Sequence, residues 1–209
     1  MRNAREIEQT RGVKVDVTAL DGQPMTSQYA TEPIGSVLHI APSFIATAVD
    51  EPTGIETTIE AHYASDRGRY VPTTIINRAV QPEFNEDRLR HTPTQAIIQS
   101  AVPRCITLTM SDGADAHDVT IADLTGSEGK IIPAWLTSAV TKRGAKDERW
   151  DVIEILYATA TLADLPPVKL IAVELDIPER TASDWIQKAR AAGRLSGMKS
   201  HVGRPAAGV

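Results

Sequence analysis

The sequence VKLIAVELDIPERTASDWIQKARAAG, residues 168–193, decides the fold of the C-terminal part of this chain. Its apolar side chains recur at helical intervals on both sides of a short break, which predicts two helices that face each other. The small Ala172 allows crossing helices to approach closely. The predicted seam between the helices consists of Ile171, Ala172, Leu175, Ile177, Ala182, Trp185 and Ile186.

The break between the two helices has residues that suit a tight turn. Asp176 stands where the first helix must turn, and Asp tolerates the left-handed conformation better than most residues. Pro178 cannot continue the first helix, but it is acceptable at the opening turn of the second. Gly193 offers a C-terminal stop for the second helix.

This stretch resembles the helix-turn-helix family of DNA-binding domains. The form it resembles has an alanine in the first helix and Thr-x-x-x-Trp in the second, here Ala172, Leu175, Ile177, Thr181 and Trp185. A further predicted helix, residues 148–160, carries Trp150, Ile153 and Tyr157 on one face and completes a three-helix unit. A plain helical hairpin with an apolar seam is the alternative interpretation.

The resemblance implies that the second helix lies in the major groove of DNA. Arg180 then pairs with guanine, Gln187 pairs with adenine, and an acidic side chain accepts from cytosine. The residues expected at base edges are Glu179, Arg180, Thr181, Ser183, Asp184 and Gln187. The residues expected at phosphates are Lys188, Arg190 and Arg194. Glu179 and Asp184 also have alternative roles within the protein. Glu179 can interact favourably with the dipole at the N-terminus of the helix, and Asp184 can form an ion pair with Lys188.

The composition fits a folded protein of the cytoplasm. The chain has 209 residues, 42% of them hydrophobic, which is enough for a real core. Its first residues are polar, and no apolar run approaches the ~18 residues needed to span a bilayer. The single Cys105 is expected to be a small buried hydrophobe.

The net charge of −5 is unevenly distributed. Residues 1–140 hold 11 basic and 18 acidic residues, a charge of −7, whereas residues 141–209 hold 11 basic and 9 acidic residues, a charge of +2. From Pro178 onward, six basic residues face two acidic ones. Such a modest positive end binds DNA weakly as one copy, so a homodimer with two helices in adjacent major grooves is expected.

The part before the helix pair is predicted to be α+β. Helices are expected to begin near Pro33, within residues 33–49, and near Pro93. The predicted strands, which alternate or are continuously apolar, cover residues 13–17, 70–79, 105–110 and 119–124.

The two halves of this part have similar patterns of residues about 60 positions apart, which suggests a repeated strand-helix unit. The matched positions are Pro33, Val37, Leu38 and Ala41 with Pro93, Ile97, Ile98 and Ala101. A chance match is the alternative. The whole chain is loosely similar to small helix-turn-helix proteins of actinobacteria and their phages, through Thr26, Tyr29 and Pro33 and again through Glu86, Leu89, Arg90 and Pro93; this similarity implies no activity.

The predicted organisation has four parts. Residues 1–125 form an α+β body for self-association or partner binding, and residues 126–146 form a linker rich in Gly and Pro. Residues 147–195 form the all-α helix-turn-helix domain. Residues 196–209 form a mobile basic tail, in which residues 203–205, GRP, are an alternative minor-groove arm.

An enzyme is not expected, because no phosphate loop, dinucleotide fingerprint or nucleophile motif occurs in the sequence. The best candidate chemistry is a Mg²⁺ or Mn²⁺ site in a nuclease, formed by Asp112, Asp115, His117 and Asp118. These residue types are equally typical of an exposed turn between strands, so neither a metal nor a cofactor is predicted.

The leading hypothesis is therefore a sequence-specific transcriptional regulator that binds double-stranded DNA as a homodimer. The alternatives are a DNA-docking adaptor of a phage or segregation assembly and, in a different class, a metal-dependent nuclease.

Overall fold

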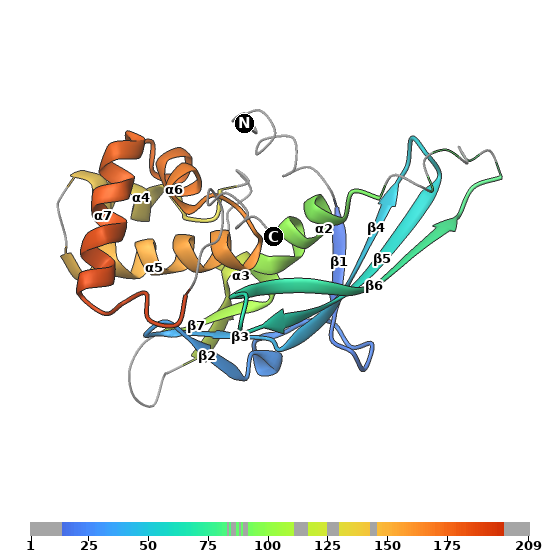
Figure 1. Cartoon of the computed structure of the whole chain (residues 1–209), viewed down its shortest axis with the longest axis horizontal. Coiled ribbons are helices and arrows are strands. Elements are labelled where there is room, and N and C mark those ends of the chain that lie inside the picture. The colour runs from blue at the N-terminus through green and yellow to red at the C-terminus, as the bar shows by residue number, and fades with distance from the viewer. Residues whose placement is uncertain are drawn as a thin grey trace, which may run out of the picture.

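The protein is mixed α/β, with two antiparallel sheets and with helices gathered in the C-terminal part (Figure 1). The computed structural model describes residues 14–82, 84, 87, 89, 92–110, 117–124, 130–142 and 146–198. None of the helices among these residues is long and apolar enough to cross a membrane.

The first sheet has four strands in the order β1-β4-β5-β6. These strands are β1 (Val15–Thr18), β4 (Ser43–Asp50), β5 (Ile55–Ala64) and β6 (Arg69–Ala79). Alternate residues such as Phe44, Ala46 and Ile59 are fully buried, because one face of the sheet covers the core and the other meets solvent.

The second sheet has the order β2-β3-β7-β8. Its strands are β2 (Glu32–Ile34), β3 (Leu38–Ile40), β7 (Ile106–Met110) and β8 (His117–Thr120). The chain passes from β3 of this sheet to β4 of the first through Ala41, whose N–H donates to the carbonyl of Cys105 at 2.9 Å. The two sheets are therefore directly connected.

The helices cover the sheets and form the C-terminal end of the molecule. The longer ones are α2 (Thr94–Ala101), α4 (Ala134–Lys142), α5 (Lys146–Leu162), α6 (Pro167–Leu175) and α7 (Glu179–Ala191). The short ones are η1 (Ser27–Tyr29), η3 (Val102–Arg104) and α3 (Ile121–Leu124). The long helix α5 is buried through Ile153, Leu156 and Tyr157, and it contacts both β6 and the α6–α7 pair. One apolar core runs from β1 to Met198.

The helix predicted within residues 33–49 is wrong, because this segment forms β2, β3 and β4. Gly35 has a φ of +69° and reverses the chain between β2 and β3. Leu38 and Ile40 are buried with period two, so the apparent helical spacing came from two strands that bury alternate residues. The repeat hypothesis fails with it, since the positions matched to α2 lie in and beside the strands β2 and β3.

The strands predicted at residues 70–79 and 105–110 and the helix after Pro93 are confirmed, as is the strand predicted at 13–17 from Val15 onward, while Val13 lies outside the described residues. The strand predicted at 119–124 ends at Thr120 and continues as α3. The cause is a capping box: the Asp123 carboxylate accepts from the N–H of Thr120 at 3.1 Å, and the Asp123 N–H donates to the Thr120 hydroxyl at 3.2 Å.

The remaining predicted boundaries cross segments that the structure describes only in part. The predicted linker 126–146 contains α4, and residues 126–129 and 143–145 lie outside the described residues. The predicted mobile tail is wrong at its start, because Met198 is buried in the core. Residues 199–209, including the GRP stretch, lie outside the described residues.

Candidate nucleic-acid interface

The turn between α6 and α7 has the geometry that its residues predict. Asp176 adopts a left-handed conformation with φ 52° and ψ 50°. The carbonyl of Ala172 accepts from the N–H of Asp176 and from that of Ile177, the latter at 3.0 Å, which ends α6. Pro178 is the N-cap of α7, and its carbonyl accepts from Thr181 and Ala182 at 2.9 and 3.1 Å. The turn from α6 to α7 therefore takes only the three residues 176–178.

The apolar seam between the two helices is confirmed. Its fully or nearly buried members are Ile171, Ala172, Leu175, Ala182 and Ile186. Ile177 and Trp185 are partly buried and pack against them. The Arg149 guanidinium of α5 lies 4.4 Å from the centre of the Trp185 ring, a cation–π contact that holds α7 against α5.

The face of α7 opposite this seam is open to solvent. Glu179, Arg180, Asp184 and Gln187 are exposed on it, and Thr181 and Ser183 are half-buried at its margin. Arg180, Asp184 and Gln187 follow each other at spacings of four and three residues, so they share one side of the helix. The six residues predicted at base edges thus lie together along the N-terminal two-thirds of α7.

Among the described residues, Arg180 and Gln187 have no hydrogen-bond or ion-pair partner. Asp184 differs, because its carboxylate lies 2.7 Å from the Lys188 ammonium group. This exposed pair confirms the simpler role expected for Asp184, although it contributes little to stability. Both side chains can exchange this contact for one with a ligand.

Two residues predicted at phosphates are engaged within the protein. The Arg190 guanidinium lies 5.3 Å from the centre of the Tyr157 ring and donates to its hydroxyl. Arg194 pairs with Asp151 and with Glu154, the latter at 3.2 Å between Nε and Oε2. Only 26% of the Arg194 side chain is exposed. Arg194 therefore fixes the segment after α7 to α5.

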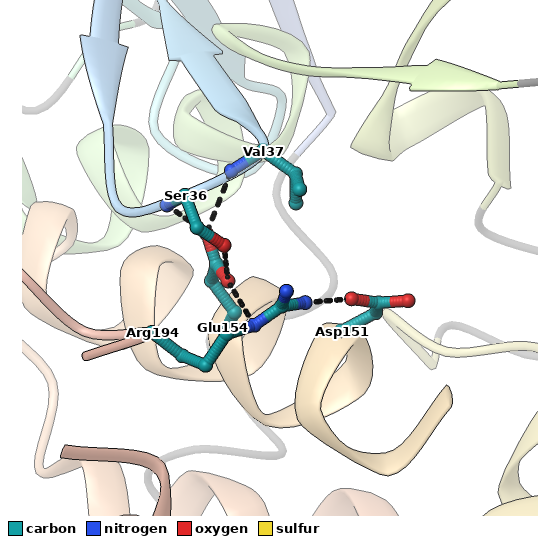
Figure 2. Close-up of polar contacts among 5 residues, drawn as sticks. All are labelled: Ser36, Val37, Asp151, Glu154 and Arg194. Carbon is teal, nitrogen blue, oxygen red and sulfur yellow. Dashed lines mark hydrogen bonds and ion pairs between the residues drawn. The ribbon is translucent and has the colours of Figure 1, made fainter. Parts of the chain in front are cut away.

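Glu154 is the centre of a network that sequence reasoning missed (Figure 2). Its side chain is fully buried on α5. Its Oε1 accepts from the N–H of Ser36 at 2.5 Å and of Val37 at 3.0 Å, and its Oε2 accepts from the Ser36 hydroxyl at 2.6 Å. The network links the β2–β3 turn, α5 and the end of α7. A signal existed in the sequence, since Glu154 is the one charged residue within 152–163.

A second buried carboxylate stabilises α6. Glu174 is fully buried and accepts from the N–H of Ile131 at 3.0 Å. The segment before α4 is thereby attached to α6, so this side of the helix pair faces protein rather than solvent. The exposed face of α7 and Val173 of α6 remain open to solvent.

The other predicted sites receive little support. Asp112 and Asp115 lie outside the described residues, and the Asp118 carboxylate accepts from the Thr109 hydroxyl at 2.6 Å. No group of three potential metal ligands occurs in the part of the chain that the structure describes. Cys105 is buried as expected, and burial raises the pKa of its thiol.

The chain matches no family model, no curated protein and no solved structure.

Proposed function

We propose that this protein binds double-stranded DNA in a sequence-specific manner through α7 and acts as a transcriptional regulator. The observation that carries the proposal is the pair Arg180 and Gln187, which are exposed on one side of α7 and have no partner among the described residues. The left-handed turn at Asp176 and the buried seam support a helix-turn-helix interpretation of α6 and α7.

The proposed mechanism is occupancy of an operator. An exposed helix fits the major groove, where Arg can donate two hydrogen bonds to guanine and Gln can pair with adenine. The half-buried Thr181 and Ser183 add hydroxyls at the edge of the same face. The Thr181 and Ser183 hydroxyls and the Arg180 and Gln187 side chains therefore form a surface for base recognition.

The charge of this surface limits the affinity of one copy. Arg190 and Arg194 contact the protein itself, and Lys188 is shared with Asp184. Few cations remain for phosphates, which supply most of non-specific affinity. Specific base contacts therefore have to supply most of the affinity of one copy, a second copy adds to it, and the homodimer is part of the proposal.

The experiment isolates DNA fragments that the full chain retains from random duplexes and then measures binding by fluorescence anisotropy. Arg180→Ala is expected to weaken binding to the selected duplex about 5- to 150-fold, the equivalent of about 1–3 kcal/mol for a bidentate base contact. Arg67→Ala is the matched control, because Arg67 is similarly exposed in the turn between β5 and β6.

Arg180→Lys separates base recognition from charge. Lysine retains the charge but loses the paired donors, so discrimination against a changed guanine should fall more than overall affinity. Retention of all duplexes with equal affinity would favour the DNA-docking adaptor. Absence of DNA binding at low salt would refute the proposal.

A further inference from the structure

The outer edge of β6 is the most open strand edge of the first sheet. Within the described part of the chain, β6 lies beside β5 on one side only. With eleven residues it is the longest strand that the structure describes. Edge strands are usually short or blocked by charge and proline. β6 has Pro72 near its start, but no charged residue lies between Arg69 and Arg78.

The backbone groups at this edge can be assigned a direction. The Val80 N–H donates to the Gly54 carbonyl at 2.9 Å, so the backbone of residue 80 faces β5. Backbone groups alternate between the two sides of an antiparallel strand. The N–H and carbonyl groups of Ile75, Asn77 and Ala79 therefore point away from β5.

Apolar side chains are exposed on both faces of the same edge. Of the seven large apolar residues exposed in the described part of the chain, four lie at this end of the sheet: Val49, Ile75, Ile76 and Val80. Ile75 is 45% exposed beside the buried Ile59, and Ile76 is 50% exposed beside Thr58. A layer on one face would cover only one of these two isoleucines, whereas another strand at the edge would contact both.

We propose that β6 pairs with β6 of a second copy in an antiparallel arrangement about a two-fold axis at Ile76. In this register Ile76 lies opposite the second copy's Ile76. The outward backbone groups of Ile75 meet those of the second copy's Asn77, and the reverse, which forms a hydrogen-bonded ladder on both sides of the axis. One surface thus meets itself, as closed dimers require.

The charges on the solvent face fit this register. Arg78 lies 3.5 Å from Glu56 of its own chain, while Thr74 is in register with Glu60. Pairing about Ile76 sets Arg78 opposite the second copy's Thr74, with the second copy's Glu60 one strand, about 4.8 Å, further on. No like charges stand opposite each other, which would destabilise the pair. An axis at Ile75 would instead set Arg78 opposite Pro72.

The pairing has a consequence for DNA binding that rests on the proposed function. α7 lies at the opposite end of the molecule from the tips of β4, β5 and β6 (Figure 1). The dimer therefore has its two α7 helices at its far ends. Two separate DNA segments, rather than the adjacent grooves expected from the sequence, are then contacted by one dimer.

Cysteine cross-linking of the full chain tests the pairing without DNA. Ile76→Cys is expected to give a covalent dimer under mild oxidation, because residues opposite each other at the axis are close. Val49→Cys is the control, since Val49 is comparably exposed but lies on the interior strand β4. The buried native Cys105 does not compete. An equal mixture of Thr74→Cys and Arg78→Cys proteins should cross-link more than either protein alone.

Mass measurement by light scattering gives the second test. The wild-type chain should show twice the 22.6 kDa of one copy, and Ile76→Lys should show a single copy. Thr58→Lys, which places lysine on the same face of the interior strand β5, should remain dimeric. A single-chain mass for the wild type, or cross-linking of Val49→Cys equal to that of Ile76→Cys, would overturn the pairing.

A DNA bridging assay distinguishes the two proposals. Ile76→Lys should retain binding to one duplex and lose the capture of a second duplex. Failure of the wild type to bind any duplex would overturn the bridging consequence and the proposed function, while the cross-linking result would still decide the pairing.

Discussion

Replacement of the buried Glu154 by glutamine should lower the stability of the whole protein. The carboxylate accepts three hydrogen bonds from Ser36 and Val37 and pairs with Arg194, and it is fully buried. Glutamine has nearly the same shape but keeps one acceptor oxygen and adds two donors. The change therefore removes charge and acceptors without opening a cavity.

The size of the effect follows from the contacts. If the amide oxygen faces the two backbone N–H groups, each charge-assisted hydrogen bond becomes a neutral one, a loss of about 1 kcal/mol each. The amide nitrogen then faces the Ser36 hydroxyl, which can accept, and Arg194, which cannot. Loss of that ion pair adds about 1 kcal/mol, because Arg194 keeps Asp151. The expected total is about 3 kcal/mol.

A loss of this size should lower the melting temperature by about 6–12 °C for a chain of this length. Differential scanning calorimetry and urea unfolding measure it, and an unchanged m-value would exclude an altered unfolded state. Glu148→Gln is the matched control on the same helix, because Glu148 is exposed and its replacement should change stability by less than about 0.5 kcal/mol. Equal melting temperatures for the two variants would refute the assigned role of Glu154.

Three other outcomes are expected. Gly35→Ala should lower the unfolding free energy by at least about 2 kcal/mol in urea, because Gly35 has a positive φ and a Cβ there would overlap Glu154 and Met198. Stability should fall between pH 9.0 and 10.0 by up to about 1.4 kcal/mol per pH unit, since burial raises the pKa of Cys105 and only the unfolded thiol ionises there; Cys105→Ala should flatten this slope in urea titrations at successive pH values. Lys188→Ala should reduce the slope of log affinity against log salt by about 0.9 if Lys188 contacts one phosphate, and an unchanged slope would show that it contacts none.

The helix pair and several strands could be predicted because their signals are local. The seam of α6 and α7 repeats within a few residues, and the turn depends on Asp176 and Pro178 themselves. The same is true of β6, whose β-branched and aromatic residues from Tyr70 to Ile76 are interrupted only by Pro72. In α6 and α7 the apolar pattern of the sequence and the burial pattern coincide, whereas in β6 the apolar Ile75 and Ile76 are exposed.

The segment 33–49 shows why periodicity alone can fail. Ile34, Leu38 and Ala41 are spaced as on one helical face, and all three are buried. Ile34 is buried from β2 and Leu38 from β3, however, because the chain reverses at Gly35, and Ala41 lies between β3 and β4. The alternation of Phe44 with its neighbours indicates the strand β4. This signal is outweighed when Pro33 is taken as the start of a helix.

The candidate site divides in the same way. Exposure of Arg180 and Gln187 follows from their spacing relative to the buried seam and could be predicted. The ion pairs of Arg194 within the protein could not be predicted. Its partner Glu154 also binds Ser36, and these two residues lie 118 positions apart in the sequence. The sequence did indicate that Glu154 has a partner, since it is the one charged residue in the stretch 152–163 and a buried charge needs a partner.

The network around Glu154 also bears on how two copies would act together. Arg194 anchors the end of α7 to α5, and Glu154 anchors α5 to the β2–β3 turn, so α7 is held to the sheets by buried contacts. In a dimer paired through β6, the distance between the two α7 helices is then set by the folded body and not by a flexible linker. A linker would allow many spacings with moderate gain, whereas a fixed span gives its gain in affinity only where two DNA sites match it. Weak binding by one copy and strict dependence on the spacing of two sites are therefore expected from the same set of contacts.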